Sequence, residues 1–148
     1  MDNMFYLCEN LQSIDVSHFD TRKVTKMNHM FHGCTSLTSL DVSNFNTSKV
    51  DDMQGMFQDL RVSTLDVSSF ETSLVIDMSG MFADCPNLTT IFASDNFVTP
   101  SVIRGQYMFS RSTNLVGING TTYSSSRVDA SYAHIDGGTS NPGYFSAR

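Results

Sequence analysis

The sequence has no tryptophan, three prolines and three cysteines among its 148 residues. Three cysteines are an odd number and too few for the disulfide framework that stabilises small secreted domains. No apolar run approaches the roughly 20 residues needed to span a bilayer, so we expect no membrane insertion. Nine Lys and Arg residues against fifteen Asp and Glu leave a net charge of -6 and no basic stripe. We therefore do not expect nucleic acid as a partner.

The composition that remains is typical of one globular domain. Hydrophobic residues make up 40% of the chain and charged residues 16%, which is too apolar for a disordered protein. The first five residues have neither the positive region nor the apolar region of a signal peptide. The N-terminus therefore gives no indication of the compartment.

A dipeptide, Met-Phe, recurs through the whole chain. Its copies begin at Met4, Met30, Met56, Met81 and Met108, with spacings of 26, 26, 25 and 27 residues. Other positions repeat in the same register, including an Asp-Val-Ser tripeptide in three copies, a Thr in four and a Val in all five. A unit of this length cannot bury its apolar face alone, so the pattern predicts copies that stack on one another.

Two periodicities alternate inside each unit. In the second copy, Leu40 and Val42 alternate with polar residues, which predicts a short strand over 37–42. Apolar residues then recur at Val50, Met53, Met56 and Leu60 in steps of three and four, which predicts a short helix with Thr47 as its N-cap. We therefore expect an α/β repeat solenoid, a right-handed stack with a parallel β-ladder on one side and short helices on the other.

The segment from Met30 to Val50, MFHGCTSLTSLDVSNFNTSKV, resembles the repeat of BspA-like leucine-rich-repeat surface proteins. The resemblance extends from Met4 to about Ser131, and residues 136–145 are similar to the segment that ends the repeat array in many members. It implies a leucine-rich-repeat fold and a bacterial cell-surface or secreted protein that adheres to host proteins or to other cells. The implied location is the cell surface or the extracellular space.

The repeats divide the chain into two parts. We expect about five repeats of 25–27 residues over 1–135, of which the first is incomplete and the last degenerate, followed by a C-terminal capping segment over 136–148. No cap precedes Met4, so we expect a fragment of a longer protein whose open apolar end could associate end to end with another copy.

One polar face is a candidate ligand-contact surface. If the strands pair in register, the three aspartates of the Asp-Val-Ser tripeptides stack about 4.7–4.9 Å apart on the outward face, flanked by small hydroxyl residues. An extracellular protein or glycan is the expected ligand. Three other interpretations remain open: a calcium site, although too few oxygen ligands are present, a face that is only solvated, and a structural stalk without a ligand. We call these residues the Ser-Asp face: Ser13, Asp15, Ser17, Ser39, Asp41, Ser43, Thr64, Asp66, Ser68 and Phe92.

The sequence offers no convincing catalytic, metal or cofactor site. Cys8, Cys34 and Cys85 share one repeat position with Leu60, which favours a buried apolar role over ligation. His29 and His32 have no third metal ligand at a fixed spacing, so a solvent-facing pair is the better interpretation. We therefore expect no enzyme activity, no metal and no cofactor.

Overall fold

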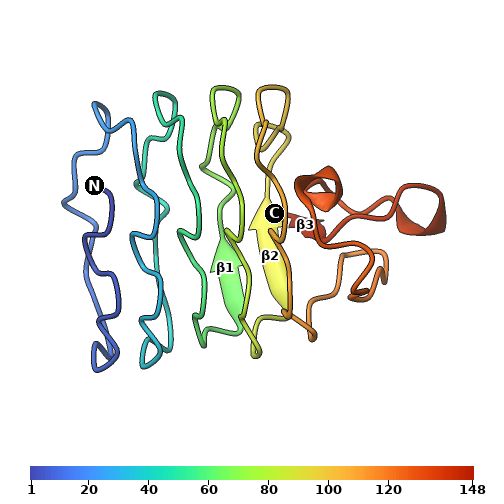
Figure 1. The fold of residues 1–148 in the computed structure, drawn as a ribbon, viewed down its shortest axis with the longest axis horizontal. Coiled ribbons are helices and arrows are strands. Elements are labelled where there is room, and N and C mark those ends of the chain that lie inside the picture. Colours follow the sequence, from blue (N-terminus) through green and yellow to red (C-terminus); the bar gives the residue numbers. More distant parts are fainter.

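The computed structural model describes residues 1–148, and the chain winds into coils that lie side by side along one axis (Figure 1). We number the coils one to five by the Met-Phe pair that each contains. Regular elements are few and short: the strands β1 (Thr64–Asp66), β2 (Thr90–Ala93) and β3 (Phe145–Ala147), and the 3-10 helices η1 (Ala130–Tyr132) and η2 (Gly138–Ser140). Neither of these helices has the length or the apolar character needed to cross a membrane.

The three strands form one parallel sheet in the order β1-β2-β3. Coils three and four supply β1 and β2, with Leu65 beside Ile91. The next place in the sheet is taken by β3 at the C-terminus, where Phe145 pairs with Ile91. The predicted strand over 37–42 is not formed, so the parallel ladder is confined to two coils and the C-terminal segment.

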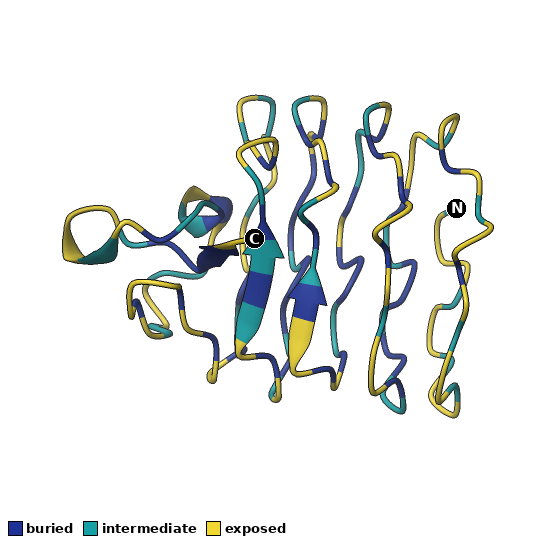
Figure 2. Cartoon of the chain, turned by 180° about the vertical axis from the view of Figure 1, so that it is seen from behind, coloured by how far each residue is buried: buried dark blue, intermediate teal, exposed yellow.

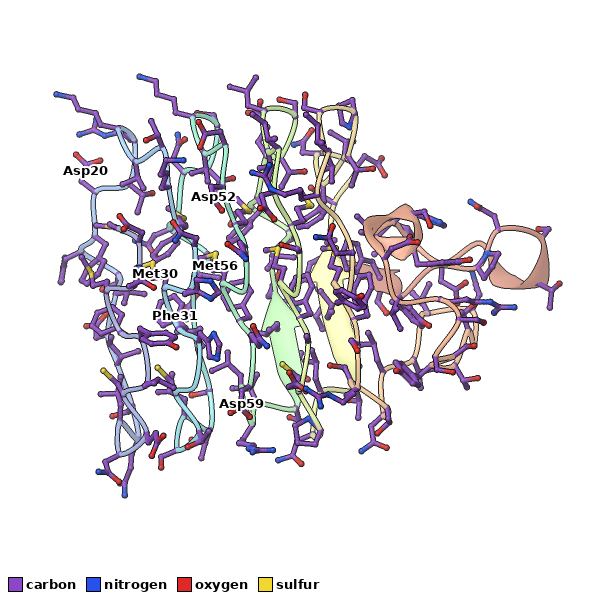
Figure 3. All side chains as sticks on the ribbon, in the orientation of Figure 1. Asp20, Met30, Phe31, Asp52, Met56 and Asp59 are labelled. Carbon is purple, nitrogen blue, oxygen red and sulfur yellow. The ribbon has the colours of Figure 1, made fainter.

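The opposite side of each coil, which we call the turn side, is held by hydrogen bonds between coils. In coil three, the backbone N–H groups of Met53, Gly55 and Phe57 donate to carbonyls of coil four at 2.9–3.0 Å. The residues between them donate locally instead, as in the 3.2 Å bond from Met56 N–H to Met53 C=O. Figure 3 shows Asp52, Met56 and Asp59 along this segment, from one edge of the coil to the other. Alternate N–H groups therefore bond to the next coil and to a turn within the coil.

This bonding pattern excludes the predicted helices, because an α-helix needs each N–H to bond four residues back in the same segment. Two positions per coil also have a positive φ angle, which breaks a right-handed helix. The predicted α/β solenoid, a right-handed leucine-rich-repeat stack with short helices on one side, is therefore wrong. The first positive-φ position is filled by Asn3, His29, Gly55, Gly80 and Tyr107, and the second by Leu7, Gly33, Asp59, Asp84 and Arg111.

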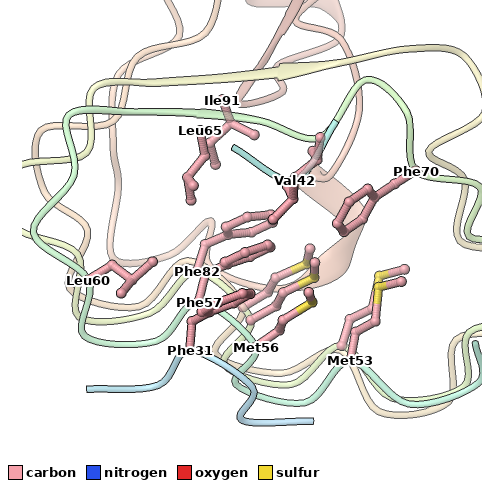
Figure 4. Packing of buried hydrophobic residues seen from close by; sticks show 14 of the residues in the cluster. Phe31, Val42, Met53, Met56, Phe57, Leu60, Leu65, Phe70, Phe82 and Ile91 are labelled. Carbon is pink, nitrogen blue, oxygen red and sulfur yellow. The ribbon is translucent and has the colours of Figure 1, made fainter. Parts of the chain in front are cut away.

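The core consists of apolar columns that run through the stack (Figure 4). Phe57 stacks between Phe31 and Phe82, with ring centroids 6.1 and 5.6 Å apart. The column continues to Phe109, whose ring lies 5.0 Å from that of Tyr144 in the C-terminal segment. Figure 2 shows that burial is weakest in the first coil, at the N-terminal end of the stack. The fully buried members of the Met and Phe columns are Met27, Met53, Met78, Met30, Met56, Met81, Met108, Phe31, Phe57, Phe82 and Phe109.

Buried threonines form a further column and join neighbouring coils. The hydroxyl of Thr47 donates to the carbonyl of Glu71 and accepts from the N–H of the same residue, both at 2.8 Å. Thr72 makes the same pair of bonds with Val98, at 2.6 and 2.7 Å. The prediction of Thr47 as a helix N-cap was therefore wrong, because its side chain satisfies the backbone of the next coil.

Replacing Thr47 by valine is expected to lower the free energy of unfolding by about 1–3 kcal/mol, because both backbone groups of Glu71 lose their partner. Thermal unfolding followed by near-ultraviolet circular dichroism measures the change. Thr47→Ser keeps the hydroxyl and serves as the control. Equal losses in the two variants would contradict the role given to this hydroxyl.

Candidate functional site

A groove of about 410 Å³ lies on the Ser-Asp face, across coils two to four. Six of the ten predicted contact residues line it. The remaining lining residues are Leu40 and Arg148. The structure therefore brings together this part of the predicted face: Ser39, Asp41, Ser43, Thr64, Asp66 and Phe92.

The other four predicted residues do not line the groove. Ser13, Asp15 and Ser17 are exposed on coil one, at the N-terminal end of the same face. Ser68 follows β1 and is half-buried. The predicted face is thus divided into six residues that line the groove and four that lie outside it.

Each aspartate of the face accepts a hydrogen bond from the N–H of the serine two residues later. The bonds are 2.9 Å for Asp15 and Asp41 and 3.0 Å for Asp66, the geometry of an Asx-turn. Hydrogen bonds from Ser17 and Ser43 lower the pKa of Asp15 and of Asp41. One carboxylate oxygen of each residue is therefore engaged in holding its own turn.

Arg148 closes the groove and was missed in the sequence. Its guanidinium forms a 2.9 Å ion pair with Asp66 and lies 4.9 Å from the centre of the Phe92 ring. Because β3 pairs with β2, the C-terminal residue reaches coils that lie far from it in the chain. No repeat pattern indicates this contact, because Arg148 lies outside the repeats.

The charges of the groove are unequal along its length. Asp66 is neutralised by Arg148, whereas Asp41 forms no ion pair. Leu40 and Phe92 add apolar surface beside these charges. Such an arrangement can hold a cationic side chain at Asp41 and an apolar one against Phe92. No group of three His, Cys, Asp or Glu side chains is placed to hold a metal ion.

Two of the three cysteines lie in the core, and Cys8 in coil one is half-buried. Cys34 and Cys85 are fully buried, and their thiols donate to the carbonyls of Phe5 and Phe57 at 3.1 and 3.2 Å. Burial raises the pKa of Cys34 to about 11 and that of Cys85 to about 12, so both remain thiols near neutral pH. In coil five, the Ser112 hydroxyl makes the equivalent bond to Phe82, at 2.6 Å. This repeat position therefore favours a small side chain that donates a hydrogen bond. The leucine at the equivalent position 60 had indicated only a buried apolar role.

The histidine pair is half-buried on the turn side. The Nδ1 atoms of His29 and His32 lie 3.1 Å apart, and the Tyr6 ring packs edge-on against both. The pKa of His32 is lowered mainly by burial and, to a smaller extent, by the neighbouring His29. The two rings are therefore engaged with each other and with coil one, and are less exposed than a solvent-facing pair would be.

A buried carboxylate organises the C-terminal segment. Asp136 is 2% exposed and accepts five hydrogen bonds of 2.6–3.4 Å. Burial alone would raise the pKa of Asp136, but these bonds outweigh it and lower the pKa to about 2. They tie together three segments of the chain, residues 119–121, residues 136–138 and Gly143. The donors are the N–H groups of Asn119, Thr121, Gly138 and Gly143 and the hydroxyl of Thr121.

Comparison with known proteins gives one family. A family model described as "Mycoplasma protein of unknown function, DUF285" matches residues 1–122. Comparisons with curated proteins and with solved structures gave no match. The matched region contains all five Met-Phe pairs and most of the groove, but not Arg148. Because the match covers more than half of the 148 residues, the chain belongs to the DUF285 family of Mycoplasma proteins of unknown function.

Proposed function

We propose that this chain is a bacterial cell-surface or secreted protein-interaction module that binds a protein ligand through the groove on its Ser-Asp face. The observation that carries the proposal is the convergence around one groove of Asp41, Asp66 and Phe92 from three coils and Arg148 from the C-terminal segment. Stacked repeats commonly present such surfaces for binding. The resemblance to BspA-like repeats supports a role in adhesion and an extracellular location.

The groove favours a particular kind of protein segment. Asp41 offers an unpaired carboxylate to a Lys or Arg side chain, and Phe92 with Leu40 offers apolar contact to a neighbouring side chain. The net charge of -6 would also attract a basic partner over distance. We therefore expect the ligand to present a basic residue next to an apolar one.

A structural stalk is the second candidate function. The Asx-turns favour it, because each aspartate of the Asp-Val-Ser tripeptides already serves its own turn. A stalk would need the stack of coils but no ligand at the groove. Neither candidate involves catalysis, a metal or a cofactor.

The double variant Asp41→Asn/Asp66→Asn tests the groove, because asparagine keeps the turn-forming oxygen and removes the charge. We expect about tenfold weaker binding to immobilised extracellular-matrix proteins in biolayer interferometry, and complete loss for Asp41→Lys/Asp66→Lys.

Asp15→Asn is the matched control, since Asp15 makes the same turn outside the groove. Unchanged binding in the double lysine variant would exclude the Ser-Asp face as the contact surface. If the unmodified protein binds none of the matrix proteins, the stalk becomes the better candidate.

A further inference from the structure

The turn side carries a second polar hollow, which shares no residue with the groove. It has a volume of about 410 Å³ and spans coils two to five. It adjoins another hollow of about 450 Å³, and Gln58, Asp84 and Arg111 line both hollows. Together the two hollows are large enough for a ligand of more than one ring.

The first positive-φ position explains the shape of the hollow. The His29 ring covers Gly55, because a Cβ added at Gly55 would lie 2.4 Å from His29 Nδ1. Gly80, in the next coil, is open, and an added Cβ would approach only the Gln58 side chain, at 3.5 Å. Tyr107 follows in coil five. The hollow thus has a glycine floor between two aromatic rings.

Tyr107 lies at the first positive-φ position, which every coil has. Its φ angle is 59°, in a region that bulky residues rarely adopt and that glycine occupies in the two preceding coils. The side chain is 66% exposed, stacks on no other aromatic ring and makes no hydrogen bond. An exposed aromatic ring at the edge of a polar hollow offers a face against which a ligand can pack.

The polar groups around the hollow match a sugar. Gln54 and Gln106 are exposed, and their side-chain amides, free of protein hydrogen bonds, can donate to one hydroxyl and accept from another. The charged groups are already paired: Arg111 with Asp84 at 2.5 Å and Arg61 with Asp59 at 3.1 Å. The surface therefore suits an uncharged ligand rich in hydroxyl groups.

We infer that this hollow binds an uncharged oligosaccharide, with one sugar ring over Gly80 against the face of Tyr107 and hydroxyls bonded to Gln54 and Gln106. The paired charges of Asp84 and Arg111 bond a second sugar in the adjoining hollow. This site is separate from the Ser-Asp face and does not depend on the function proposed for it.

Two variants test the site. Tyr107→Gly removes the ring and places the residue preferred at this backbone position, so the thermal midpoint should stay within about 2 °C of the unmodified value. Gly80→Asn fills the floor with a residue that tolerates a positive φ, as Asn3 does at the same position of coil one. Gly120→Asn is the control, because Gly120 has a φ of 90°, has no neighbour near its added Cβ and lies outside the hollow.

The probes are lactose, N-acetyllactosamine, diacetylchitobiose and maltotriose, with sialyllactose as the charged comparison. Binding is followed by saturation-transfer NMR and by the side-chain amide signals of the glutamines. We expect saturable binding of at least one uncharged sugar, about tenfold weakened in Tyr107→Gly and Gly80→Asn and unchanged in Gly120→Asn. Absence of binding for all four uncharged sugars would overturn the inference, and so would binding in Tyr107→Gly and Gly80→Asn as strong as in the unmodified protein.

Discussion

Replacing Phe57 by alanine is expected to lower the free energy of unfolding by about 3–5 kcal/mol. The ring is fully buried and lies between two nearly parallel rings, those of Phe31 and Phe82. Its removal leaves a cavity in the middle of the column and weakens the contacts of coil three with both neighbours. Because each coil contacts only its neighbours, the loss is not shared with the rest of the stack.

The measurement is denaturant unfolding followed by near-ultraviolet circular dichroism, since the chain has no tryptophan for fluorescence. Phe5→Ala is the matched control: Phe5 is partly buried and stacks against only one neighbouring coil, through Phe31. We expect a clearly smaller loss there. A loss at Phe57 no greater than at Phe5 would mean that the column does not carry the stability of the stack.

Replacing Asp136 by alanine is expected to cost about 3 kcal/mol of unfolding free energy, because its five donors, among them those of the buried Thr121 and Gly143, lose their acceptor. The effect depends on pH. The pKa of Asp136 is lowered from 3.8 to about 2 on folding, so its contribution is complete above about pH 4 and is lost as the pH falls through 2. The shift corresponds to about 2 kcal/mol.

Unfolding free energies measured between pH 5 and pH 2 separate this effect from that of the other aspartates. The unmodified protein should lose about 2 kcal/mol more over this range than Asp136→Ala does. Asp95→Ala is the control, because Asp95 is exposed and forms no ion pair or side-chain hydrogen bond. Parallel pH profiles for the unmodified protein and Asp136→Ala would show that Asp136 is not the titrating group.

The buried columns could be predicted from the sequence, but their local structure could not. Apolar steps of three and four are shared by a helical face and by a succession of turns, so Met53, Met56 and Leu60 point inward in either structure. The distinguishing signal was the residue before each Met-Phe pair. Gly55 and Gly80 at that position, with Asp59 and Asp84 four residues later, indicate positive φ angles.

The candidate groove was only partly predictable for a different reason. Repeat register places Asp41 beside Asp66 and Phe92, because these positions recur at the repeat spacing. Arg148 follows Asp66 by 82 residues and lies outside any repeat, so only the pairing of β3 with β2 brings it there. The hollow on the turn side was missed because it depends on which coils have glycine at the first positive-φ position. That is a difference between repeats, whereas the repeat pattern shows only what the copies share.

The hydrogen bonds between coils have a mechanical consequence. They run along the stack and join the N–H groups of one coil to carbonyls of a neighbouring coil, so tension applied along this axis pulls each bond apart in line. Coils joined only to their neighbours would then separate one after another, each releasing roughly 80–90 Å of extended chain. A molecule of this kind lengthens in steps under load and keeps its remaining coils intact.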